Sequence, residues 1–452
     1  MVGGWPALLC MLVVQEGGLW LVERVSGAAE RSWASGLFLG AFALRAAVAL
    51  PMHYVLSLSN GNGALFPDDH TNDVVAEWLV RIGRGEGLSI FPGHQHLLDS
   101  SYTYLVSGVY AVFGYAPLLP KLVNCALGGF NAFLIFEIAR RSFGARAAAL
   151  AGLGAAVIPT LILWSLLTLK ETMVLLVALI GLWALQSLAQ RTSATRAADG
   201  LVLFIIAMVA SIDLRLTTTV ILLPLGLLVV ARQIRGSALA WLFAGITATL
   251  ITAMGVGFFA LRSETTGRPP DTIVEDVLLQ IRHRRAQEAA NARSQIRPQV
   301  EVVAPDGHSG LPDAEAASDQ APFSFSADVL DPLGYALLAP APWQVRSLTE
   351  LALSAEMLAW YAFLGGAFFA LRAGPSDRTF VACLIVFGVA NWLALAASEG
   401  NLGNLVRHRL MLAPSLLILG GAGLHWLWIR TGRPILARSP IGGLRLEARR
   451  GL

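Results

Sequence analysis

GLFLGAFALRAAVALPMHYVLS (residues 36–57) is followed shortly afterwards by FPDDHTND (residues 66–73). The first stretch is apolar and has the length of about 20 residues that a helix needs to cross a bilayer. The second stretch holds three carboxylates and one imidazole. If residues 36–57 span a membrane, the acidic stretch lies at the membrane surface, and we expect the functional site there.

The chain as a whole has the composition of a membrane protein. Its 452 residues are 55% hydrophobic and only 14% charged, and its mean hydropathy is +0.62. Soluble domains carry about 25% charged residues. We therefore predict an all-α polytopic bundle of about 10–11 transmembrane helices with surface helices on the outward side. The apolar segments that could span are 36–57, 117–139, 147–166, 172–190, 200–213, 216–231, 237–261, 349–371, 379–398 and 410–429.

Two apolar regions have more than one interpretation. Residues 5–22 contain Gln15 and Glu16 and follow no basic segment, so we do not assign a signal peptide. They form either an extra span or an interfacial helix. Residues 200–231 could be a broken pair of helices.

The predicted organisation has five parts. These are an N-terminal apolar segment, a catalytic transmembrane module with an acidic first outward loop at 59–116, a partly disordered extracytoplasmic loop, the C-terminal transmembrane helices and a basic cytoplasmic tail. Their bounds are 1–35, 36–261, 262–348, 349–430 and 431–452.

Arginines in the short loops predict the orientation, because cytoplasmic loops of membrane proteins are enriched in basic residues. The loops with arginine lie near residues 24–31, 140–146, 191–196, 232–235, 372–378 and 430–450. With these in the cytoplasm, the outward segments are 59–116, 167–171, 213–215, 262–348 and 399–409. This arrangement requires that residues 102–114, which are short and aromatic, form a re-entrant or surface helix.

The acidic stretch offers candidates for acid–base chemistry. Asp69, Asp73 and Glu77 are spaced by four residues, which places them on one face of a helix. A carboxylate there could act as a general base or bind a divalent cation such as Mg²⁺ or Mn²⁺. The alternative is an acidic first turn of a surface helix, stabilised by the helix dipole.

The other outward charges could bind an anion. Lys170-Glu171 and Arg407-His408-Arg409 stand at predicted span ends, where a phosphate could meet them, although snorkelling at the membrane surface would also explain Lys170. Asp213 and Arg215 could neutralise each other at a helix break. His94 and His96 lack a neighbouring third ligand, so we expect no metal site there.

Several motifs, in this order, resemble the C-type superfamily of integral-membrane glycosyltransferases, which includes protein O-mannosyltransferases and the lipid A aminoarabinose transferase. The motifs are Asp68-Asp69, the aromatic segment from Tyr102 to Phe113-Gly114, the span ending Ala139-Arg140-Arg141-Ser142-Phe143-Gly144, and the span from Ala147 to Pro159. The chain departs from the family pattern in having Asp-Asp where Asp-Glu is common, and in having Asp73 where an aromatic residue is common.

The resemblance implies inverting transfer of a sugar from a polyprenyl-phosphate carrier to an envelope lipid, glycan or protein. The catalytic base would be Asp69, with Asp68 and then Asp73 as the alternatives. The phosphate would be held by Lys170, Arg215, Arg407 and His408, with support from Glu171, Asp99 and Tyr102. The protein would lie in the cytoplasmic (inner) membrane of a bacterium, among membrane lipids and with the site facing outward, and no nucleic-acid partner is expected.

Two other functions fit the composition. A polysaccharide polymerase or ligase that uses undecaprenyl-diphosphate-linked glycans would also need an arginine-rich outward site. A lipid or glycan transporter would be expected to show inverted repeats and broken helices near the membrane midplane. We find no internal repeat, which disfavours the transporter.

Overall fold

The computed structural model describes residues 4–86, 100–190, 194–233, 331–345, 348–399 and 402–431, and within these segments the regular structure is helical, with no strand. The α-helices are α1 (Gly4–Val25), α2 (Arg31–Asn60), α3 (Pro67–Gly83), α5 (Ser101–Phe113), α6 (Leu118–Phe143), α7 (Ala145–Val157), α8 (Pro159–Leu163), α9 (Glu171–Ala189), α10 (Ala194–Leu214), α11 (Leu216–Gln233), α15 (Asp331–Leu338), α16 (Leu348–Ala367), α17 (Arg378–Ser398), α18 (Leu402–His408) and α19 (Ala413–Arg430). Short 3₁₀ turns are η3 (Pro342–Gln344), η4 (Ala370–Ala373) and η5 (Arg409–Leu412).

The helices have the length and composition of membrane spans. Six helical segments of the described residues qualify, or seven if the bent pair α7–α8 counts as one span. The six are Trp5–Val25, Arg31–Asn60, Leu118–Phe143, Glu171–Ala189, Arg378–Ser398 and Leu402–Arg430. The predicted helical membrane bundle is therefore confirmed, and the N-terminal apolar segment is a helix of spanning length. The predicted span 237–261 and most of the loop 262–348 lie outside the described residues.

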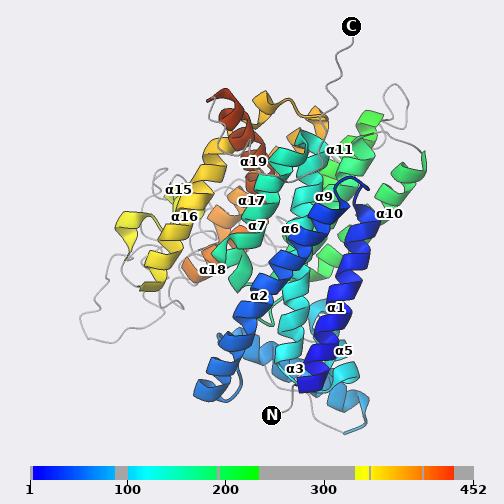
Figure 1. Cartoon of the computed structure of the whole chain (residues 1–452), viewed down its shortest axis with the longest axis vertical. Coiled ribbons are helices and arrows are strands. Elements are labelled where there is room, and N and C mark those ends of the chain that lie inside the picture. Colours follow the sequence, from blue (N-terminus) through cyan, green and yellow to red (C-terminus); the bar gives the residue numbers. More distant parts are fainter. Residues whose placement is uncertain are drawn as a thin grey trace, which may run out of the picture.

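Helix α6 is at the centre of the bundle, and α1 is at its edge. Helix α6 packs against α1, α2, α7 and α9 (Figure 1). Of its apolar span 83% is buried, compared with 11% for α1. A helix that is apolar all round is buried by its neighbours, whereas the exposed side chains of α1 suit contact with lipid.

The Phe-Gly pairs of the two motifs, at 113–114 and 143–144, each end a helix. Gly114 follows α5 with φ 85°, and Gly144 follows α6 with φ 86°. Side chains with a Cβ rarely adopt positive φ, so glycine allows the chain to leave the helix abruptly at these positions.

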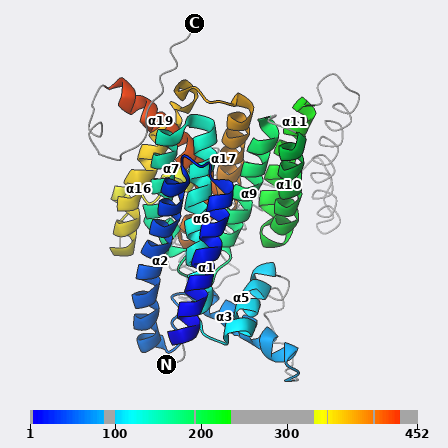
Figure 2. The same cartoon turned by 45° about the vertical axis from the view of Figure 1, so that its right-hand side comes forward.

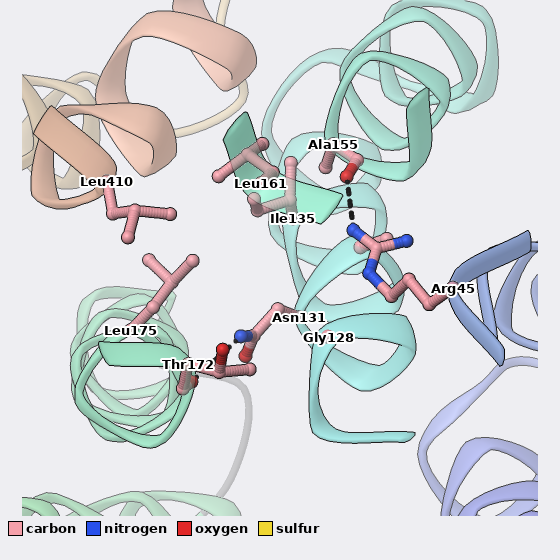
Figure 3. Close-up of a pocket in the computed structure, with 10 residues that line it drawn as sticks. Arg45, Gly128, Asn131, Ile135, Ala155, Leu161, Thr172, Leu175 and Leu410 are labelled. Carbon is pink, nitrogen blue, oxygen red and sulfur yellow. Dashed lines mark hydrogen bonds between the residues drawn. The ribbon is translucent and has the colours of Figure 1, made fainter. Parts of the chain in front are cut away.

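Proline breaks the next span. Helix α7 ends before Ile158-Pro159, and the axis bends by 59° into the following segment. The Arg45 guanidinium, almost fully buried, donates to the carbonyls of Ala155 and Ala156, which have lost helical partners at the break. Figure 3 shows Arg45 on one side of a small cavity whose other walls include Asn131, Leu175 and Leu410.

The C-terminal helices pack through glycine. A Cβ on Gly366 of α16 would collide with the carbonyl oxygen of Gly420 on α19, and one on Gly423 would collide with the carbonyl oxygen of Gly366. Small residues allow backbones to approach this closely in helical membrane proteins.

The loop arginines after α6 and the acidic stretch lie at opposite ends of that helix, because Arg140 is in its last turn and Lys121, near its start, contacts Asp69. At one end, Arg140 lies 3.7 Å from Glu30, and Ser376 donates to the backbone of Arg141 and Ser142. We call this the arginine end. Helices α3 and α5 lie across the opposite end, at the bottom of Figures 1 and 2. We call this the acidic end; it comprises α3, α5, residues 164–171, residues 213–215, Glu399 and residues 402–409.

Candidate active site

The acidic stretch begins helix α3. Phe66 is extended, Pro67 is the first helical residue, and Asp68 and Asp69 follow in the first turn. Proline tolerates the first helical position because the N–H that it lacks would have no helical acceptor, and acidic residues there suit the positive end of the helix dipole. The Phe66 ring stacks on Trp164 with centroids 5.8 Å apart, which holds the start of α3 against residues 164–170.

Asp69 is buried, and both oxygens of its carboxylate accept hydrogen bonds. Its Oδ2 accepts hydrogen bonds from Lys121 Nζ at 3.0 Å and from the Leu65 amide at 3.1 Å, and its Oδ1 accepts from the Thr168 amide at 2.7 Å. The side chains of Asp69 and Lys121 are both 0% exposed. These contacts make Asp69 a structural anchor for the start of α3, and its role as the base, the first choice from sequence, stays a prediction.

Lys121 extends this anchor to the loop between α2 and α3. Besides Asp69, its ammonium donates to the Gly63 carbonyl at 2.7 Å. The sequence signal for Lys121 was available, because it is one of only two lysines in the chain and lies in an apolar segment. Ionisable groups at such positions are costly unless paired, and sequence analysis did not assign this one a role.

Asp73 is also buried, one turn further along α3. Its Oδ1 accepts a hydrogen bond of 2.5 Å from the Tyr110 hydroxyl. Within the described residues, its Oδ2 has no hydrogen-bond partner. Burial raises the pKa of Asp73 to about 7, against the opposing effect of the Tyr110 hydrogen bond, and the neighbouring Asp69 charge raises it further.

The raised pKa of Asp73 predicts that the stability of the fold depends on pH. Its pKa is higher in the folded protein than the value of about 3.9 expected in an unfolded chain, so the folded state binds this proton more tightly. The stabilisation that comes from the proton on Asp73 is complete below pH ~4 and is lost as the pH rises through ~7. In detergent, the unfolding midpoint of the wild type should fall relative to that of Asp73→Asn between pH 5 and 8. Parallel curves for the two proteins would contradict this assignment, and Glu86→Gln, at an exposed position, is the control.

Asp68 is the carboxylate of α3 that solvent can reach. Its side chain is 67% exposed, and its Oδ2 accepts from Arg407 Nη1 at 3.1 Å. The same guanidinium donates from Nε to Glu171 Oε1 at 2.6 Å. Arg407 thus connects the first turn of α3 to the first residue of α9, and of the neighbouring pair Asp68 and Asp69 only Asp68 is exposed to solvent.

Two further cations lie close to this ion-pair group. The charge of Glu171 acts on both Lys170 and Arg215, and the charge of Arg407 opposes both. Burial lowers the pKa of Lys170 and that of Arg215. In the part of the chain that the structure describes, neither side chain donates a hydrogen bond, so both can bind an incoming anion.

His408 has a carboxylate partner of its own. Its Nδ1 lies 2.6 Å from Glu399 Oε1, which also accepts from the Ser398 hydroxyl at 3.0 Å. Burial alone would raise the pKa of Glu399, but the hydrogen bond and charge of His408 hold it below its usual value. Sequence analysis placed residues 399–409 on the outward side without giving Glu399 a role.

Arg409 differs from the two residues before it. It is buried, and its guanidinium donates to the carbonyls of Ala336 and Ala339 and to Met357 Sδ. The suggestion that it binds a lipid phosphate is therefore wrong. Its hydrogen bonds satisfy carbonyls at the end of α15, where helical partners are missing.

Tyr102 and Asp213, two further residues singled out in the sequence, hold neighbouring segments of the acidic end together. Tyr102 is buried and accepts from Asn124, which also donates to the carbonyls of Leu167 and Leu169. Asn124 thereby holds the loop before Lys170 in place, and sequence analysis missed it. Asp213 accepts from the Ser101 amide at 2.6 Å and forms no ion pair with Arg215, contrary to the suggested pair.

A metal site at the acidic end is not tested by these residues. In the described segments, no three His, Cys, Asp or Glu side chains are placed to hold a metal ion. Asp99, His94 and His96 lie outside the described residues. The predicted support from Asp99 therefore stays a prediction.

No family model and no curated protein matches the chain. A crystal structure of ArnT from Cupriavidus metallidurans bound to undecaprenyl phosphate is similar to it. The identity is 18%, the TM-score is 0.44, and the match covers 85% of this chain and 60% of that one. The chain thus spans less than two thirds of the length of that protein, and a similarity this distant assigns no activity to it.

Proposed function

We propose that this membrane protein is a glycosyltransferase that takes a sugar from a polyprenyl-phosphate carrier at its acidic end. The observation that carries the proposal is the exposed Asp68 beside Arg407, with Lys170 and Arg215 next to them. A carboxylate that can take a proton and cations that can bind a phosphate thus meet at one end of a bundle of apolar helices. The order of sequence motifs that resembles C-type glycosyltransferases supports the same proposal.

The reaction assigns a role to each group. An acceptor hydroxyl or amine attacks the anomeric carbon of the sugar and gives its proton to the Asp68 carboxylate. The bond between that carbon and the phosphate oxygen breaks, and its electron pair stays on the phosphate. The phosphate gains negative charge in this step, which Lys170, Arg215 and Arg407 stabilise in the transition state.

The surface near the cations suits the lipid part of the donor. Ile212 and Leu216, on either side of Arg215, are both 56% exposed. Apolar side chains can contact the polyprenyl chain while the neighbouring cation binds its phosphate. The basic loops at the arginine end favour an orientation with the acidic end outside the cytoplasm. A tag at residue 70 reported as cytoplasmic would contradict that orientation.

A polymerase or ligase that uses diphosphate-linked glycans is the second candidate. The specific observation in its favour is the number of basic side chains, since Lys170, Arg215, Arg407 and His408 together could hold two phosphates. Donors with one phosphate and with two phosphates, compared in the same assay, distinguish the two candidates.

Donor binding tests the proposal directly. The purified full chain would be incubated with short-chain polyprenyl-phosphate sugars and an envelope lipid extract, and sugar transfer and donor KM would be measured. We expect Arg215→Gln and Lys170→Gln each to raise the donor KM about 10- to 100-fold, because charge-assisted hydrogen bonds contribute about 1.5–3 kcal/mol. Arg84→Gln removes an exposed cation at the same end of the molecule and should leave KM unchanged. Absence of donor turnover by the wild type would refute the proposal.

A further inference from the structure

The pair of His408 and Glu399 is a separate feature of the acidic end. Glu399 follows the end of α17, and His408 is the last residue of α18. Their side chains are 2.6 Å apart, and Glu399 is almost completely buried, whereas His408 is about one quarter exposed. A buried carboxylate that accepts from Nδ1 fixes the orientation of the imidazole and leaves its Nε2 to act on another molecule.

The groups around this pair belong to the candidate phosphate site. The His408 charge acts on Glu171 of α9, which binds Arg407 directly. The Arg215 charge, between α10 and α11, acts on both Glu399 and Glu171. Of these groups, Glu399 contacts His408 directly, and the His408 charge acts on Glu171. His408 also follows Arg407 in α18, and Arg407 binds Glu171, so the imidazole belongs to the same end of the molecule as the cations that would receive a phosphate.

His408 differs from these cations in one chemical respect. Arginine and lysine keep their protons near neutral pH, whereas a histidine can give its proton up in this range. When a sugar leaves a polyprenyl-phosphate diester, the phosphate becomes a monoester whose second ionisation has a pKa of about 6. A proton delivered in that step would limit the charge that develops on the leaving group.

We propose that His408 is the proton donor to the departing phosphate and that Glu399 is its positioning residue; this rests on the proposed transferase function. As the bond between the sugar and the phosphate breaks, its electron pair stays on the phosphate oxygen, and that oxygen takes the proton from His408 Nε2. The proton of the acceptor goes to Asp68. Return of a proton from Asp68 to His408 through solvent restores both groups.

The pH profile of transfer tests this role. A general acid is active only while it carries its proton, so kcat of the wild type should decline at high pH. In Glu399→Gln we expect that decline to begin at lower pH, because a neutral amide stabilises the imidazolium less than a carboxylate does. His408→Gln should lower kcat about 100-fold, within the range for general acids, with a smaller change in donor KM.

A lysine at position 408 separates proton donation from charge. His408→Lys retains a cation that does not give up its proton near neutral pH, so donor binding should persist while kcat stays about 100-fold low. His425→Gln, on α19 towards the arginine end, is the matched control and should behave as the wild type. Full recovery of kcat in His408→Lys, or an unchanged high-pH decline in Glu399→Gln, would overturn the role of the pair and leave the transferase function standing. If the wild type transfers no sugar, the transferase function and this role fall together.

Discussion

Asp68→Asn is expected to lower the kcat for sugar transfer by about 100- to 10,000-fold, which is the usual contribution of a general base. Asparagine keeps the size of the side chain and an oxygen that can accept from Arg407, as Asp68 Oδ2 does at 3.1 Å. It cannot take the acceptor proton. The fold and the donor KM should therefore change little, and the loss should appear in kcat, measured with short-chain polyprenyl-phosphate sugars.

The control for Asp68 is another exposed carboxylate that pairs with an arginine. Glu86 pairs with Arg81 at the end of α3, and both side chains are more than 40% exposed. Exposed ion pairs contribute about 0–1 kcal/mol, so Glu86→Gln should leave both transfer and stability unchanged. If Asp68→Asn retained wild-type kcat, the base would have to be another residue.

Lys121→Met is expected to lower the free energy of unfolding by about 3–5 kcal/mol. It leaves the Asp69 carboxylate buried without its cation and removes the donor to the Gly63 carbonyl. The start of α3 should then lose its attachment to α6, so we expect transfer to fall as well. Thermal unfolding of the purified protein in detergent measures the loss of stability.

The only other lysine, Lys170, provides the comparison. It is partly exposed and donates no hydrogen bond within the described residues, so Lys170→Met should change stability by less than about 1 kcal/mol. Adding Asp69→Asn to Lys121→Met removes the unpaired charge and should recover part of the lost stability. Equal stability of Lys121→Met and the wild type would show that the buried pair is not the anchor of α3.

The residue pattern of the chain determined the bundle and the difference between its two ends. Both follow from properties that are local in sequence. An apolar run of spanning length must be covered by lipid or by other helices, whatever its neighbours are. Likewise, Pro159 interrupts its span, and Gly114 and Gly144 end theirs, because their effects act on the adjacent backbone. The outward orientation of the acidic end stays a prediction from the loop arginines.

Only the tertiary structure decided which of those charges is available for chemistry. Asp68 and Asp69 are neighbours in one helical turn, where successive side chains point about 100° apart, so one can be buried while the other stays exposed. Which one is buried depends on Lys121 and on the Thr168 amide, and these come from other parts of the chain. Arg407 reaches Asp68 across 339 positions of sequence. Neither periodicity nor motif order contains such a contact, because it arises when α3, α9 and α18 pack at the acidic end.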